Sequence, residues 1–177
     1  MRTDEEIFMH ANKVELLILD VDGVLTDGSL YYSGSDVEIK AFNVKDGHGI
    51  KLLQRNGVEV AFITGRKSDA VKRRADELGI NHVYQRAIDK LLAYDDLKEK
   101  VGIADAKIGF VGDDLIDIPI TKRVGFAVAV ADANSELISR SLYVTKANGG
   151  RGAVREVCEI ILKSKGLWEE VLSQYDR

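Results

Sequence analysis

The stretch Leu16-Leu-Ile-Leu-Asp-Val-Asp-Gly-Val-Leu-Thr26 decides the fold. Its apolar run, followed by a glycine-containing turn, is typical of a strand buried on both faces of a parallel sheet. Side chains two residues apart on a strand point to the same side, so Asp20 and Asp22 are expected to emerge together where the strand ends. Paired carboxylates repel each other unless a cation offsets their charge. The pair predicts a site for Mg²⁺, with one aspartate as nucleophile and the other handling protons.

A second acidic cluster supports this interpretation. Taken alone, Asp20 and Asp22 favour a structural role in which one caps the turn and the other is solvated. However, Lys107-Ile-Gly-Phe-Val-Gly-Asp-Asp-Leu-Ile-Asp117 repeats the pattern of apolar strand, glycine and acids. The ends of strands in an open α/β sheet converge on one crevice, so Asp113 and Asp114 are expected to share one metal with the first pair.

Two further residues, Thr64 and Lys90, could bind a phosphoryl group beside these carboxylates. Thr64 ends a third apolar strand and precedes a glycine, which allows a ligand to approach the backbone closely. Lys90 opens a helix after the short strand at 82–84, so its ammonium could meet a phosphate oxygen in the same crevice. Taken alone, Thr64 is more often a turn residue and Lys90 more often a solvated one. Only the carboxylates make the functional roles the better interpretation.

The order of elements predicts an α/β fold with a Rossmann-like, doubly wound parallel sheet. Strands are expected at 14–20, 58–64, 82–84, 107–111, 126–130 and 142–144. Helices are expected at 46–56, 68–78, 89–101, 117–123, 134–139 and 153–165. Nothing indicates a domain boundary, so residues 1–177 are interpreted as one domain with a C-terminal helical tail at 153–177.

Residues 28–43 interrupt this alternation. Two short runs with strand character flank Ser33-Gly-Ser-Asp36, which predicts an inserted β-hairpin. An isolated hairpin is marginal in water, and this one would expose Tyr31, Tyr32, Ile39 and Phe42. It either folds back onto its own domain or packs against another subunit.

Composition excludes several classes of protein. The 177 residues are 45% hydrophobic, which is enough to bury a core without disulfide bonds or a structural metal ion. With 25 basic and 29 acidic residues, the formal charge of −4 gives no general attraction for nucleic acid. No signal peptide is visible, and no apolar run approaches the ~20 residues that span a membrane. We expect a cytoplasmic protein in which Cys158 is core filler on a helix face.

The motifs resemble those of the haloacid dehalogenase (HAD) superfamily of phosphatases, since Asp20-x-Asp22, Thr64, Lys90 and Gly112-Asp113-Asp114 occur in the family's order. Longer stretches between Leu16 and Leu162 resemble the family of 3-deoxy-D-manno-octulosonate 8-phosphate (KDO 8-phosphate) phosphatases, which lack a large cap domain. They are Asp20-Val-Asp-Gly-Val-Leu-Thr-Asp-Gly28, Ala41-Phe-Asn-Val-Lys-Asp-Gly-His-Gly-Ile50, Ile63-Thr-Gly-Arg-Lys67, Gly112-Asp-Asp-Leu-Ile-Asp117 and Gly149-Gly-Arg-Gly-Ala-Val-Arg-Glu156.

The resemblance implies a role for each matching position. Asp20 would be the nucleophile, Asp22 the acid and base, and Thr64 and Lys90 the phosphoryl-binding residues. Mg²⁺ would be bound by Asp20, the backbone carbonyl of Asp22 and Asp113, with Asp114 and Asp117 orienting its waters. Substrate-binding positions would be Asn43, Val44, Lys45, Asp46, Gly47, Lys51, Arg66, Arg74 and Lys90. Arg151 could equally cover the ligand or belong to a flexible loop. Hairpins of this family are expected to assemble at the centre of a homotetramer.

One residue departs from the family pattern. Members usually carry glycine where this chain has Arg86, and arginine does not visit positive φ as freely. We therefore expect the loop that delivers Lys90 to be shaped differently.

The predicted function is Mg²⁺-dependent hydrolysis of KDO 8-phosphate through an aspartyl phosphate, in lipopolysaccharide biosynthesis. A phosphatase for a related nonulosonic acid 9-phosphate is the alternative enzyme, because both substrates combine a carboxylate with a terminal phosphate. A receiver-like signalling domain is the alternative from a different class. It is disfavoured because receivers carry the phosphoacceptor on a middle strand of the chain. The choice of metal among Mg²⁺, Mn²⁺ and Co²⁺ stays open.

Overall fold

A computed structural model describes residues 3–34 and 38–176 of the chain. Its centre is a six-stranded parallel sheet in the order β5-β4-β1-β6-β7-β8. The strands are β1 (Leu16–Leu19), β4 (Glu59–Ile63), β5 (His82–Tyr84), β6 (Ile108–Gly112), β7 (Phe126–Ala129) and β8 (Tyr143–Val144). Strand order reverses at β1, as expected of a doubly wound sheet, so the predicted fold class is confirmed.

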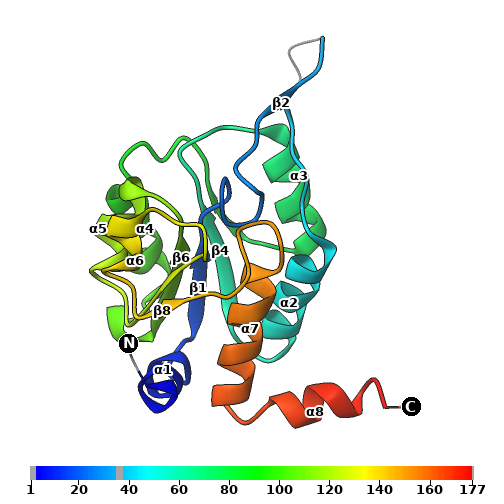
Figure 1. Ribbon diagram of the computed structural model, residues 1–177, viewed down its shortest axis with the longest axis vertical. Coiled ribbons are helices and arrows are strands. Elements are labelled where there is room, and N and C mark those ends of the chain that lie inside the picture. Colours follow the sequence, from blue (N-terminus) through cyan, green and yellow to red (C-terminus); the bar gives the residue numbers. More distant parts are fainter. Residues whose placement is uncertain (1–2, 35–37, 177) are drawn as a thin grey trace.

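Helices cover both faces of this sheet, as Figure 1 shows. Helices α1, α2, α3 and α7 pack on one face of the sheet, and α4 and α5 pack on the other. The α-helices are α1 (Asp4–Ala11), α2 (Val44–Arg55), α3 (Asp69–Leu78), α4 (Lys90–Val101), α5 (Ile118–Thr121), α6 (Ser135–Ile138), α7 (Ala153–Ser164) and α8 (Trp168–Ser173). Two 3₁₀-helices are η1 (Asp105–Lys107) and η2 (Leu115–Asp117). No helix in these described ranges has the length and apolar content needed to cross a bilayer.

The central strand β1 is apolar on both faces because it contributes to two cores. Leu17 and Leu19 pack with the layer of α2 and α7, whereas Leu16 and Ile18 pack with α4 and α5. All four side chains are fully buried. Burial of each aliphatic side chain contributes about 1.5–3 kcal/mol, so this strand is a rigid base for the loop that follows it.

The inserted hairpin lies outside the main sheet. Its strands β2 (Tyr31–Tyr32) and β3 (Glu38–Ile39) are shorter than predicted and pair antiparallel, Tyr31 with Ile39 and Tyr32 with Glu38. Figure 1 shows it projecting beyond the end of the sheet at which β1 finishes. Tyr31, Tyr32 and Ile39 are exposed as predicted. Phe42 is not: it is partly buried against the core, so the prediction that it is exposed is wrong.

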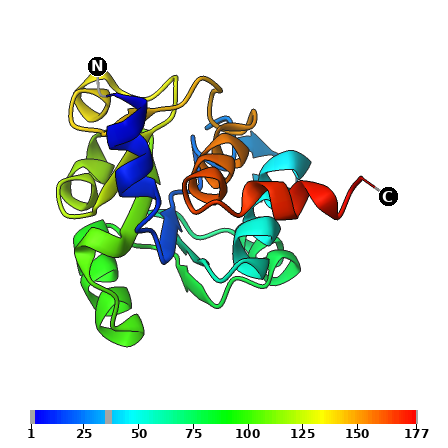
Figure 2. The same cartoon turned by 90° about the horizontal axis from the view of Figure 1, so that it is seen from below.

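The structure departs from the predicted elements at α1, at η1 and in the C-terminal tail. Helix α1 and the turn η1 occur where no helix was expected, and α8 follows α7 after a break at Gly166, whose φ is +72°. The break divides the predicted helical tail: α7 packs along α2 in the core, whereas α8 projects outward toward the C-terminal end in Figure 2. All six predicted strands and the six predicted helices are present with slightly different ends.

Candidate active site

The carboxyl ends of three neighbouring strands build one pocket. Leu19 of β1 is in register with Phe62 of β4 and Val111 of β6, so the residues that follow these strands meet at one edge of the sheet. The pocket has a volume of about 250 Å³. It is lined by Asp20, Asp22, Gly28, Thr64, Gly65, Arg66, Asp113, Asp114 and Ile116.

Asp20 is held between the backbone and a buried cation. Its side chain is 5% exposed, and its Oδ1 accepts a hydrogen bond of 2.7 Å from the amide of Val21. Its Oδ2 lies 2.8 Å from the Nζ of Lys90, whose side chain is 1% exposed. Lys90 contacts a second carboxylate, with its Nζ 2.6 Å from Oδ1 of Asp117. The predicted convergence of Lys90 on Asp20 is therefore present.

Asp117 is the innermost acid of the site and is fully buried. Its Oδ2 accepts hydrogen bonds from the amides of Asp113, at 2.9 Å, and Asp114, at 3.3 Å. Asp114 in turn caps η2, with its Oδ1 2.8 Å from the amide of Leu115. Asp117 thus shapes the loop that carries Asp113 and joins it to Lys90.

Asp20, Asp113 and Asp117 form a candidate metal centre. Each offers one carboxylate oxygen, and these atoms lie within 4.8 Å of one another. An all-oxygen, anionic donor set suits a hard divalent cation. The carboxylate of Asp22 is not part of this group. The prediction that Asp22 contributes its backbone carbonyl instead stays a prediction.

The electrostatics of the cluster favour an added cation. Burial, together with the charge of Asp117, raises the pKa of Asp20 to about 6 although Lys90 opposes the shift. Burial and the charges of Asp20 and Asp117 raise the pKa of Asp113 to about 8. Burial acts to lower the pKa of Lys90, but the two carboxylates outweigh it and raise that pKa. A divalent cation would relieve this repulsion and favour ionised carboxylates.

Glycines allow the loop after β1 to approach Asp113 and the loop at 149–152. A Cβ atom on Gly23, whose φ is +87°, would lie 2.0 Å from Oδ2 of Asp113. A Cβ on Gly149 would lie 1.7 Å from the carbonyl oxygen of Gly23. The amide of Gly150 donates a 2.8 Å hydrogen bond to the carbonyl of Val24. The loop at 149–152 therefore packs against the loop that carries Asp20 and Asp22 and supports it.

The loop that delivers Lys90 keeps a left-handed residue without a glycine. Arg86 has φ of 58°, and its amide donates a 3.2 Å hydrogen bond to the carbonyl of Arg66. The next residue, Ala87, donates to the carbonyl of Thr64 at 3.0 Å. Asp89 then caps α4 by accepting from the amide of Leu91. Because Arg86 adopts the conformation that glycine favours, the expected change of loop shape is not needed to bring Lys90 to Asp20.

Sequence reasoning missed two residues of the hairpin. Lys40 is a fully buried lysine whose Nζ forms an ion pair with Oδ1 of Asp22 and lies 3.0 Å from Oε1 of Glu38. Glu38 also binds Arg66, at 2.6 Å. Partial burial acts to raise the pKa of Glu38, but hydrogen bonds from Arg66 and Lys40 lower it to about 2. Glu38 and Lys40 are spaced by two within the run that has strand character, which places their side chains on one side, and this is the signal that could have pointed to them.

The remaining predicted substrate residues lie in different surroundings. Arg66 lines the pocket, while Arg74 lies over the ring of Phe42, at 5.8 Å, and 3.4 Å from the carbonyl of Asn43. Gly47 makes room for Arg74, since a Cβ there would lie 2.1 Å from the guanidinium. Val44 and Lys45 are exposed at the start of α2.

Asp46 and Lys51 are engaged elsewhere in this structure. The buried carboxylate of Asp46 accepts from the amides of Gly152, at 3.3 Å, and Arg155, at 2.8 Å, and so caps α7. Lys51 donates to the carbonyl of Leu78 at 2.7 Å. Arg151 extends from its loop to Asp27, at 3.1 Å. Contacts of these residues with a substrate stay predictions.

Comparison with known proteins agrees with this geometry. Residues 80–157 match the family model of the haloacid dehalogenase-like hydrolases. The 3-deoxy-D-manno-octulosonate 8-phosphate phosphatase KdsC of Escherichia coli (strain K12) is 50% identical over 169 residues, covering 96% of this chain and 90% of that protein. The fold and its acidic site thus define a hydrolase of the haloacid dehalogenase class.

Two solved structures place the chain more narrowly. The Yersinia pestis 3-deoxy-D-manno-octulosonate 8-phosphate phosphatase matches with a TM-score of 0.92 and 45% identity, over 93% of this chain and 89% of that one. The Moraxella catarrhalis enzyme of the same name, in complex with a magnesium ion, a phosphate ion and a KDO molecule, matches with a TM-score of 0.95 and 41% identity over 97% and 98%. The chain belongs to the family of KDO 8-phosphate phosphatases.

Proposed function

We propose that this protein hydrolyses KDO 8-phosphate to KDO and inorganic phosphate, a step of lipopolysaccharide biosynthesis. The observation that carries the proposal is that Asp20, which lines the pocket at the ends of β1, β4 and β6, is paired with the buried Lys90, which also contacts the buried Asp117. It is the arrangement expected for a carboxylate nucleophile that meets a phosphoryl group. The 50% identity to the Escherichia coli phosphatase supports the choice of substrate.

The reaction proceeds in two steps on the side chains of this site. In the first, a carboxylate oxygen of Asp20 attacks phosphorus, the bond from phosphorus to the sugar oxygen breaks, and Asp22 donates a proton to that oxygen. In the second, Asp22 takes a proton from water as the water oxygen attacks phosphorus. The bond from phosphorus to Asp20 then breaks and phosphate leaves. Thr64 and Lys90 hold the phosphoryl oxygens throughout.

Mg²⁺ is the proposed cofactor, held by Asp20, Asp113 and the backbone carbonyl of Asp22. When bound, it offsets the negative charge of nucleophile and phosphate, which would otherwise repel each other. Asp117 supports this site from beneath by fixing the amides of Asp113 and Asp114. The magnesium and phosphate ions in the Moraxella catarrhalis complex support the assignment.

Substrate selectivity is proposed to arise around the hairpin. The phosphate pocket is small and carries no large cap, so the sugar acid must be recognised by residues outside it. Arg66 pairs with Glu38 of the hairpin strand β3, and Arg74 contacts the carbonyl of Asn43 after it, which makes both arginines candidates for binding the carboxylate of the substrate. A homotetramer built on the exposed hairpins, in the cytoplasm, completes the proposal.

Steady-state phosphate release from a panel of sugar phosphates tests the substrate. KDO 8-phosphate should give the highest kcat/KM, above a nonulosonic acid 9-phosphate and simple hexose phosphates. A higher kcat/KM for the nine-carbon substrate would replace the proposal with its alternative. Phosphorylation of the chain that stops at one equivalent, without turnover, would instead favour a receiver.

A further inference from the structure

The proposed mechanism gives Asp22 its task but does not explain what holds its side chain. Asp22 follows the strand β1 by three residues and lies in a loop, where a carboxylate could rotate freely. In the structure its Oδ1 is bound by the ammonium of Lys40, which comes from the hairpin and not from the sheet. A side chain on a loop is therefore fixed by a second, distant segment.

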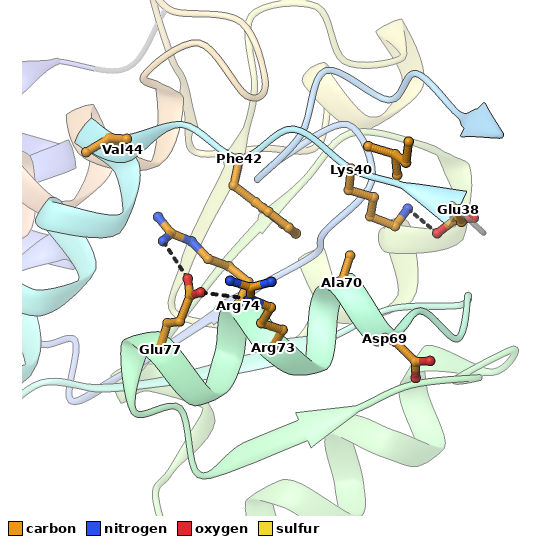
Figure 3. A pocket seen from close by; sticks show the side chains of 10 residues that line it. Glu38, Lys40, Phe42, Val44, Asp69, Ala70, Arg73, Arg74 and Glu77 are labelled. Atoms are coloured by element: carbon orange, nitrogen blue, oxygen red, sulfur yellow. Dashed lines mark hydrogen bonds and ion pairs between the residues drawn. The ribbon is translucent and has the colours of Figure 1, made fainter. Parts of the chain in front are cut away.

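Lys40 is well suited to hold the carboxylate of Asp22 because its own side chain is held in place. Its side chain is fully buried, and the only carboxylates that pair with it among residues 3–34 and 38–176 are Asp22 and Glu38. Figure 3 shows Lys40 reaching along β3 toward Glu38 at the edge of a neighbouring pocket of about 550 Å³. Glu38 is anchored in turn by Arg66, at 2.6 Å. A buried ammonium needs such partners, so its position is fixed on both sides.

The two oxygens of Asp22 are unequal. Oδ1 accepts from Lys40, whereas Oδ2 is buried and has no hydrogen-bond partner within the part of the chain that the structure describes. A buried, unpaired carboxylate oxygen is unfavourable and marks a group that is kept for a ligand or a reaction. Since Lys40 has only protons to donate, a proton carried by Asp22 must sit on Oδ2.

We propose that Lys40 is a positioning residue that binds Oδ1 of Asp22 and so presents Oδ2 for proton transfer to the leaving group. This inference rests on the proposed function, because Asp22 must be the acid for its orientation to matter. It links the hairpin directly to the chemistry: displacing β3 would displace Lys40 and, through it, Asp22.

A series of small phosphate esters distinguishes positioning from general structural support. The esters range from para-nitrophenyl phosphate, whose leaving group departs without a proton, through phenyl phosphate to a simple primary alkyl phosphate, whose leaving group needs one. They carry no sugar acid, so recognition of the natural substrate does not enter. The quantity measured is kcat/KM, which includes departure of the leaving group but not the later attack of water.

Lys40→Met should lower kcat/KM for the alkyl ester by about 100-fold and that for para-nitrophenyl phosphate by less than about 3-fold, in line with the contribution of a positioned general acid. Asp22→Asn should show the same selective loss, and adding Lys40→Met to Asp22→Asn should lower the rates no further. Lys107→Met is the matched control: it removes an exposed ion pair with Glu15, of 2.6 Å, and should leave the whole series unchanged.

An equal loss of kcat/KM for every ester in Lys40→Met would overturn the proposal, because a purely structural defect acts on all of them alike. Should Lys40→Met not fold, as judged by circular dichroism, Lys40→Arg decides, since it keeps the charge but moves the donors. It must then show a selective, smaller loss for the alkyl ester, and an unchanged or uniform series would count against positioning. If the native enzyme hydrolyses the small esters but not KDO 8-phosphate, the proposed substrate fails while this test still stands.

Discussion

The Nζ of Lys90 lies 2.8 Å from Oδ2 of Asp20 and 2.6 Å from Oδ1 of Asp117, so one buried ammonium serves two carboxylates. It balances only part of the charge that Asp20, Asp113 and Asp117 bring together. Burial, together with this remaining repulsion, raises the pKa of Asp20 to about 6 and that of Asp113 to about 8. The net charge of this cluster changes when the metal ion binds and again when the phosphorylated substrate binds, and a phosphatase can use both changes.

This repulsion predicts how stability depends on pH and on Mg²⁺. A carboxyl group whose pKa is raised by folding binds its proton more tightly in the folded state, so its stabilising effect is present below about pH 4 and is lost as pH rises. After treatment with a chelator, the Tm of the native protein should therefore fall between pH 5 and 8 relative to that of Asp113→Asn. Mg²⁺ should raise the Tm of the native protein by roughly 5 °C or more at pH 8.

The increase at pH 5 should be smaller, because Mg²⁺ then competes with protons for the same oxygens. Differential scanning calorimetry at both pH values measures it. An equal Mg²⁺ effect at pH 5 and pH 8, or one that survives Asp113→Asn, would show that the metal binds elsewhere.

The packing of Gly149 against Gly23 predicts that a methyl group far from the chemistry impairs catalysis. Gly149→Ala places its Cβ within 1.7 Å of the Gly23 carbonyl oxygen, which is backbone and cannot move alone. The loop that carries Asp20 and Asp22 must shift, so kcat should fall by about 10-fold or more, since small misplacements of reacting groups cost that much. Gly34→Ala is the control, because no atom of the residues that the structure describes lies within 4 Å of a Cβ there. Equal kcat values for the two variants would disprove the supporting role of this loop.

The left-handed backbone of Arg86 predicts an unusual order of stability among substitutions. With φ of 58°, the position disfavours a β-branched side chain, so Arg86→Val should lower the free energy of unfolding by about 1–2 kcal/mol. Arg86→Gly should change it by less than about 1 kcal/mol, since glycine adopts this conformation freely but gains entropy when unfolded. Urea unfolding measures both. A stability loss in Arg86→Gly equal to that in Arg86→Val would mean that the arginine side chain, and not the backbone, is what matters.

The exposed aromatic residues of the hairpin predict self-association. Tyr31 is 50% exposed and Tyr32 65%, on a two-stranded element outside the main sheet. Replacing both with serine should weaken the proposed tetramer, because each aromatic ring that is buried between subunits contributes about 1.5–3 kcal/mol. Sedimentation velocity measures the effect, and exposed Tyr175→Ser is a control outside the hairpin. A native protein that sediments as a monomer would refute the tetramer, and an unchanged tetramer in the double variant would refute the role of the hairpin.

The sequence predicted those parts of the site that depend on local patterns. Asp20, Thr64 and Asp113 follow buried strands whose apolar runs are unmistakable, and parallel register then brings them together. Lys40 was missed because its burial depends on where the hairpin folds back, which short strands with exposed side chains do not reveal. Asp117 was expected near metal-bound water, and only the structure shows its contact with Lys90.

Helix boundaries show the same division between local and tertiary causes. The αL caps at Gly79 and Gly102 end α3 and α4 where glycine follows a helical run, which is a local pattern, and the predicted helix ends at 78 and 101 agree with them. Helix α1 escaped prediction because only Ile7 and Ala11 are buried, too few to give an apolar stripe that a sequence pattern could reveal. The motif around Asp46 predicts a substrate-binding residue. In the structure its carboxylate caps α7 by accepting from amides 106 and 109 residues away in the sequence, a contact that no local sequence pattern could predict.

The central claim is that Asp20 becomes phosphorylated during turnover, and trapping the intermediate tests it most directly. The enzyme with Mg²⁺ is mixed with excess substrate, quenched in acid within milliseconds, and treated with borohydride, which reduces an aspartyl phosphate to homoserine. Peptide mass spectrometry should then find homoserine at position 20 in the native protein and at no position in Asp20→Asn. Homoserine at another aspartate, or phosphate release with no modified residue at any quench time, would contradict the account.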